Sequence, residues 1–132
     1  MKHSFRWLAT GGILTCLLLF GTAPLIDAQG TASMTAKLVD PEKKAAMREA
    51  TVEVTVNVKL IDPASVGEKP TAGQGHLHYQ VDTGPIIATP AAKLSFHELS
   101  PGAHTIVVTL VGNDHKPLVP AQKLTVTVPT TR

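Results

Sequence analysis

The stretch "TVEVTVNVKLI" (Thr51–Ile61) decides the fold class. Valine or leucine occupies every second position, and Thr, Glu, Asn and Lys occupy most of the positions between. Successive side chains of a β-strand point to opposite faces, so this alternation predicts a strand with one face in an apolar core and the other in water.

More strands are expected after this one. "HLHYQV" (His76–Val81), "KLSFH" (Lys93–His97) and "KLTVTV" (Lys123–Val128) alternate in the same way, and a short strand is expected at Ile86–Ala88. "AHTIVVTLV" (Ala103–Val111) is apolar on both faces, which indicates a central strand. About seven short strands separated by turn signals predict an all-β protein, an immunoglobulin-like β-sandwich. The disulfide and the buried tryptophan typical of such domains are not available, because residues 29–132 contain neither Cys nor Trp. Apolar packing must therefore hold the sheets together.

The N-terminal segment has the pattern of a secretory signal peptide, Met1–Ala28. Lys2 and Arg6 precede the apolar run Leu8–Phe20, which is short for a membrane span of about 20 residues. Cleavage after Ala28 leaves a chain with no membrane span, so we expect a periplasmic or secreted protein. The single cysteine, Cys16, lies in the apolar run, so the mature chain is expected to contain no disulfide.

Two parts are expected after the signal peptide. Residues 29–50 are predicted to be a flexible lead-in with a short edge strand at Ala36–Val39 or a helical turn in "DPEKKAAMREA" (Asp40–Ala50). In that helical alternative Asp40 suits the N-cap and Pro41 the first helical position. Residues 51–132 are predicted to form the sandwich domain. The formal net charge of +2 argues against a nucleic-acid partner, which requires a basic patch or stripe.

Histidines supply the best candidate for a functional site. His76 and His78 share the strand face opposite Leu77 and Tyr79, with their Cβ atoms about 6.5–7 Å apart. His115 lies in the loop "GNDHKPLVPAQ" (Gly112–Gln122), which the immunoglobulin-like topology places at the same end of the sandwich. Three imidazoles form a ligand set typical of zinc or copper.

Carboxylates near these histidines extend the predicted metal site. Asp114 is predicted as a further ligand or a second-shell acceptor, and Asp62 is a candidate for the same support. Because no thiolate is available, Zn(II) or Cu(II) is expected rather than Cu(I). The alternative is that His76 and His78 are ordinary polar residues on the outer face of a strand.

The remaining histidines of the mature chain are expected to serve the fold. His104 falls in register with the inward residues of its strand, so it should cap backbone groups at a corner where many such domains carry a tyrosine. His97 is expected to be a solvated edge residue.

Catalysis is not expected: Ser95 and His97 are same-face strand neighbours, and no G-x-S-x-G elbow accompanies them. The His-x-His pair resembles that of Cu/Zn superoxide dismutase, but the resemblance stops at the pair.

Three motifs resemble those of an uncharacterised family of small exported bacterial β-sandwich proteins, a domain of unknown function. They are "GHLHYQVD" (Gly75–Asp82, G-H-x-H-x-x-x-D), "LSPGAHT" (Leu99–Thr105, L-x-P-G-x-H-T) and "DHKP" (Asp114–Pro117, D/N-H-x-P). The resemblance covers roughly 52–129 and implies a periplasmic or secreted sandwich with a histidine-lined edge. It implies no activity.

The function expected from the sequence is therefore that of an exported, non-catalytic β-sandwich protein binding a divalent transition metal at His76, His78, His115 and Asp114. The alternative is an immunoglobulin-like module that contacts another protein or the cell envelope without metal. An exposed apolar patch beside Leu118 would favour that alternative.

Overall fold

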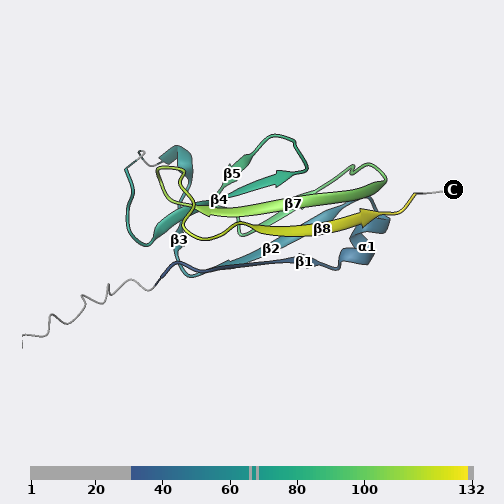
Figure 1. Ribbon diagram of the computed structural model, residues 1–132, viewed down its shortest axis with the longest axis horizontal. Coiled ribbons are helices and arrows are strands. Elements are labelled where there is room, and N and C mark those ends of the chain that lie inside the picture. Colours follow the sequence, from purple (N-terminus) through teal and green to yellow (C-terminus); the bar gives the residue numbers. More distant parts are fainter. Residues whose placement is uncertain (1–30, 66, 68, 131–132) are drawn as a thin grey trace, which may run out of the picture.

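In the computed structural model, which describes residues 31–65, 67 and 69–130, the Thr51–Ile61 stretch forms two strands instead of one (Figure 1). These are β2 (Ala50–Val56) and β3 (Lys59–Leu60). The break falls at Asn57, whose side-chain Oδ1 accepts a hydrogen bond from Ser33 N at 2.7 Å and whose Nδ2 donates to Thr31 O at 2.9 Å. Asn57 thus ties down the chain ahead of β1, and the backbone beyond it crosses to the second sheet.

The two sheets face each other as an immunoglobulin-like β-sandwich, which confirms the predicted fold class (Figure 1). One sheet has the order β1-β2-β6, and the other has the order β3-β4-β7-β8 with β5 on the β4 edge. Strands β4 and β7 are the central strands of the second sheet and pair antiparallel. The remaining elements are β1 (Met34–Val39), α1 (Pro41–Ala46), the 3₁₀ helix η1 (Pro63–Ser65), β4 (Gln74–Val81), β5 (Ile87–Thr89), β6 (Lys93–Phe96), β7 (Gly102–Val111) and β8 (Gln122–Val128).

The sandwich begins at Met34, not at Thr51 as the sequence suggested. Strand β1 pairs with β2 along its whole length, from Met34↔Val56 to Val39↔Thr51, and Met34 is buried in the core. The Gln122 side chain then joins the two sheets, because it accepts from Ala36 N and donates to Met34 O, both at 2.8 Å. The expected edge strand and the expected helical turn are therefore both present, as β1 and α1, and both belong to the domain.

The burial of Tyr79 shows which face of β4 packs in the core. Its side chain is fully buried, its hydroxyl donates to Ala91 O at 2.7 Å, and its ring lies edge-on to Phe96. Burial raises the pKa of Tyr79 to about 12. Leu77 is fully buried on the same face, and each such side chain stabilises the fold by about 2–3 kcal/mol. Strand parity then turns His76 and His78 to the opposite face of the sheet.

The predicted signal peptide, Met1–Ala28, and Cys16 within it lie outside the described residues. Over the part of the chain that the structure describes, no helix has the length and apolar character required to cross a membrane.

Candidate metal centre

Strand β4 presents His76 and His78 on its outer face, opposite Val111 and Thr109 of β7. An outer face is normally wet, yet His76 is only 1% exposed, and His78 is half-buried. Part of the chain must therefore lie over the start of β4. The alternative, an ordinary polar residue on the outer face of a strand, therefore does not hold for His76, which is buried.

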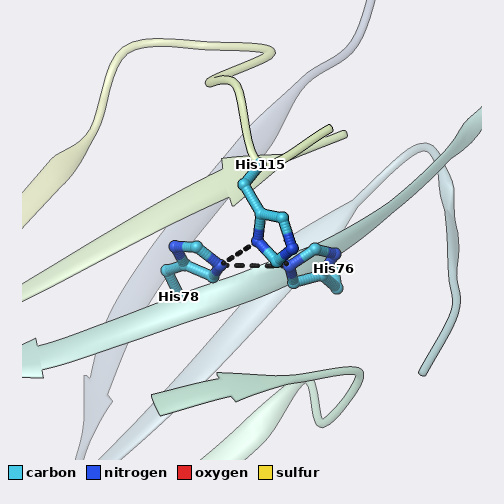
Figure 2. A group of neighbouring side chains, drawn as sticks. All are labelled: His76, His78 and His115. Carbon is cyan, nitrogen blue, oxygen red and sulfur yellow. Dashed lines mark hydrogen bonds between the residues drawn. The ribbon is translucent and has the colours of Figure 1, made fainter. Parts of the chain in front are cut away.

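The loop after β7 folds back across this face. His115 N donates to Gly112 O and Gly112 N donates to Lys116 O, both at 2.9 Å, which closes a tight turn at the end of β7. His115 itself has φ 60°, a left-handed conformation that costs a residue with a side chain about 1–2 kcal/mol. Figure 2 shows the result: the His115 ring reaches from the loop toward the two histidines on the strand.

Gly75 allows the strand and the loop to lie this close. A Cβ atom at this position would lie 2.5 Å from Val111 O and 3.3 Å from Leu118 Cδ1. The first of these is a backbone atom of the paired strand, so any larger residue would force β4 and β7 apart just before His76. The glycine of the "GHLH" motif is explained by this contact.

The three imidazoles converge through one nitrogen each. His76 Nε2 lies 3.0 Å from His78 Nε2 and 3.3 Å from His115 Nδ1, and the last two atoms are also 3.3 Å apart (Figure 2). Among the described residues, this trio is the group of at least three His, Cys, Asp or Glu side chains close enough to share an ion. The three histidines singled out from the sequence are thus brought together.

This triangle has the dimensions of a tetrahedral metal site. Nitrogens bound to zinc at 2.0–2.1 Å in tetrahedral geometry lie about 3.3–3.4 Å from one another. The three nitrogens, 3.0–3.3 Å from one another, would be able to hold one such ion together. All three donors are imidazole nitrogens, which suit zinc and copper.

Hydrogen bonding alone accounts poorly for the same triangle. A neutral imidazole carries one N–H, so one inward N–H can be shared between the other two nitrogens, which then face each other with lone pairs. His76 Nδ1, on the far side of its ring, is buried and has no hydrogen-bond partner among the described residues. Leaving such an atom unpaired costs about 1–3 kcal/mol, whether or not an ion is bound at Nε2.

Electrostatics keep the trio in the form that binds metal. Burial lowers the pKa of His76, and the positive charges that His78 and His115 could carry lower it further. Burial also lowers the pKa of His78, with a second contribution from His115. Both rings therefore stay neutral, with a free lone pair, to a lower pH than an exposed histidine does.

The two predicted carboxylates do not join the trio. Asp114 Oδ1 accepts a hydrogen bond from Lys116 N at 3.3 Å, and its Oδ2 lies 3.8 Å from Lys116 Nζ. This side chain therefore stabilises the turn in which it lies. Asp62 Oδ1 accepts from Ala64 N at 2.9 Å at the start of η1. The ligand set that the geometry supports is narrower than the predicted one and consists of histidines alone.

His104 lies at the opposite end of β7 and is 8% exposed, as its inward register predicts. Its Nδ1 lies 2.7 Å from Asp82 Oδ2 and its Nε2 lies 2.7 Å from Ser100 O. Both partners are acceptors, so this environment favours the imidazolium form, in which both nitrogens donate. The Ser100 carbonyl, followed by the Asp82 carboxylate, raises the pKa of His104, and the His104 hydrogen bond lowers the pKa of Asp82.

The sequence did not reveal this partnership between His104 and Asp82. One feature of the sequence could have indicated it. Asp82 directly follows β4, and β4 pairs with β7, the strand that contains His104. His97 is an exposed edge residue, as expected, with Nδ1 3.0 Å from Glu49 Oε1. This hydrogen bond lowers the pKa of Glu49, as does the one from Lys44.

Comparison with known proteins adds little to this geometry. No family model and no curated protein matches the sequence. Among solved structures, the extracellular domain of BT4673, described as a one component system, from B. thetaiotaomicron is similar with a TM-score of 0.41 and 13% identity over 63% of this chain. The matched part is 10% of the length of that protein chain.

Proposed function

We propose that this is an exported protein that binds one divalent transition metal ion, Zn(II) or Cu(II), through His76, His78 and His115. The observation that carries the proposal is the convergence of three imidazole nitrogens at 3.0–3.3 Å from one another. A bound cation accepts all three lone pairs at once, which no arrangement of protons among neutral rings achieves.

The surroundings of the trio support binding of this kind. His76 is buried and held on a central strand, so one ligand is fixed before the ion arrives, and strand geometry fixes His78 beside it. His115 is exposed and comes from a loop, which gives the ion a path from solvent. A left-handed backbone at His115 fits a functional position, because such strain gathers at ligand-binding sites.

Calorimetric titration of the metal-free mature protein with Zn(II), and separately with Cu(II), tests the proposal. We expect about one equivalent to bind. The His76→Ala/His78→Ala double variant should lose this binding, whereas His97→Ala, which removes an exposed histidine outside the trio, should retain it. Equal affinity in the wild type and the double variant would contradict the proposal.

Export rests on the predicted signal peptide. N-terminal sequencing of the protein recovered from a periplasmic or secreted fraction should start at Gln29. An N-terminus at Met1 in that fraction, or recovery in the cytoplasm alone, would contradict cleavage.

A second candidate function is contact with another protein or the cell envelope. Leu118 is 41% exposed and lines an open groove of about 710 Å³ at the loop end of the sandwich, with Ala32, Val58 and Pro70 as further apolar walls. If this groove binds a partner, Leu118→Lys should abolish co-purification of that partner, and a metal chelator should have no effect. Loss of the partner on chelation alone would favour metal binding as the function.

A further inference from the structure

The charge of the ligand set determines what a bound ion can do. Three neutral imidazoles leave the full 2+ charge on the ion, whereas each carboxylate ligand would remove one unit. Asp114, the carboxylate next to His115 in the chain, contacts Lys116 in its own turn and is absent from the group of converging ligand atoms. A zinc ion held by this trio would therefore be a strong Lewis acid.

The three histidines differ in their exposure to solvent. Of the three ligands, His76 is buried, His78 is half-buried and His115 is exposed, so the cover over the ion thins toward the loop. Water can reach the ion there and complete a tetrahedral shell. A closed structural site supplies a fourth protein ligand, and the described residues place none with the trio.

The far side of the buried ligand favours the same chemistry. Metal-binding histidines usually donate their second N–H to a carboxylate or carbonyl, which raises the basicity of the ring. His76 Nδ1 has no such acceptor among the described residues. His76 is thus a weaker electron donor than a histidine backed by carboxylate, and the acidity of water on the ion is preserved.

We propose that the zinc-loaded protein hydrolyses small, uncharged activated esters at this open position. The proposal rests on the metal binding proposed above and departs from the non-catalytic function expected from the sequence. The zinc-bound water loses a proton to buffer, and the resulting hydroxide oxygen forms a bond to the carbonyl carbon of the ester. The bond from that carbon to the leaving alkoxide or phenolate oxygen breaks, the carboxylic acid so formed gives its proton to the leaving oxygen, and carboxylate and alcohol or phenol are released. One water is consumed for each ester, and nothing is oxidised or reduced.

The surface around the trio limits the substrates. None of the four main hollows found over the described residues is lined by His76, His78 or His115. Because none of these four hollows lies at the trio to hold a leaving group or an acyl chain, selectivity should be low. The rate should rise in proportion to substrate concentration without saturation.

The test is hydrolysis of 4-nitrophenyl acetate by the full mature protein with one equivalent of Zn(II), compared with the same protein after chelation. Zinc occupancy is measured by calorimetry in the same samples. We expect a rate at least about tenfold above that of the metal-free protein near pH 8.5. The rate should rise with pH around a midpoint between about 7, as for zinc-bound water in carbonic anhydrase, and about 9, as for aqueous zinc.

Two variants make the result specific. His115→Ala should bring the zinc-dependent rate down to the metal-free level, and His97→Ala should leave it unchanged, which separates zinc chemistry from nucleophilic attack by surface imidazoles. Full zinc occupancy with no rate above the metal-free protein would overturn this proposal and leave metal binding intact. Absence of zinc binding would overturn both.

Discussion

The two ends of the β4–β7 strand pair each hold a shielded histidine, and the two behave in opposite ways. At one end, His76 faces two other imidazoles and has a lowered pKa. At the other end, His104 faces a carbonyl and a carboxylate, each at 2.7 Å, and has a raised pKa. Both side chains are less than a tenth exposed, at 1% and 8%. Burial by itself therefore does not determine the role of a histidine in this fold; its neighbours do.

His76 therefore has the surroundings of a metal ligand, whereas His104 has those of a residue that stabilises the fold. His104 has an acceptor for each ring nitrogen, so its hydrogen bonds are complete within the protein. His76 directs Nε2 at two other imidazole nitrogens, so the lone pairs at this point are not all used until a cation arrives. We expect changes at one end to alter metal affinity and changes at the other to alter stability.

The largest expected effect is on metal affinity. His115→Ala should weaken zinc binding by more than about 100-fold, because loss of an outer-shell partner alone costs about 10–100-fold. The metal-free variant should be within about 0.5 kcal/mol of the wild type in free energy of unfolding, since His115 is exposed. Calorimetry and urea unfolding check the two halves. Unchanged zinc affinity in this variant would remove His115 from the site.

The converse change is His104→Ala. Removing two hydrogen bonds made by a buried imidazolium should lower the free energy of unfolding by about 2 kcal/mol. Zinc affinity should stay within about twofold of the wild type, because additivity holds for sites at opposite ends of a strand pair. If this variant lost zinc binding while remaining folded, the division between the two ends would be wrong.

A third change tests the contact that brings the loop over the strand. Gly75→Ala places a Cβ against Val111 O, and such overpacking costs about 1–3 kcal/mol. Since the shift begins one residue before His76, zinc affinity should fall as well. Gly67→Ala is the matched control, because a Cβ there meets nothing within 4 Å. Equal stability and affinity in the two variants would show that the close approach at Gly75 has no role.

The smallest expected effect is the pH dependence of the His104–Asp82 pair. The pKa of His104 is raised from 6.5, so its contribution is full below pH 6.5 and is lost as pH rises through the raised value. The pKa of Asp82 is lowered from 3.8, so its contribution is full above pH 3.8 and is lost as pH falls through the lowered value. The difference in Tm between wild type and His104→Ala should therefore be widest between these two pH values and narrower at pH 9. A difference in Tm that does not change with pH would mean that the pKa of His104 is the same in the folded and the unfolded protein.

Much of the fold could be predicted from alternation alone. Thr51–Ile61, His76–Val81 and Lys123–Val128 each alternate strictly, and the sheets bury the predicted faces. The break at Asn57 could not be predicted, because the apolar pattern runs on unbroken through Val58 and Leu60. What ends β2 is a pair of side-chain hydrogen bonds to residues more than twenty positions earlier, and pattern within a strand carries no information about them.

The candidate site was predictable for a similar reason and only to a similar extent. Strand parity paired His76 with His78, and sandwich topology brought in His115. Burial of His76 could not be foreseen, because it depends on the turn from Gly112 to Lys116 folding back over the sheet. The sequence placed Asp114 beside the metal only because it is the chain neighbour of His115. In the structure the backbone at His115 is left-handed, and Asp114 contacts Lys116 in the same turn instead.

The most direct test of the account is the position of the metal in a crystal of the zinc-loaded protein, located by anomalous scattering at the zinc edge. We predict one peak, about 2.0–2.1 Å from His76 Nε2, His78 Nε2 and His115 Nδ1. A zinc peak at His97 or His104, or a fully loaded protein with no peak at the trio, would contradict the account.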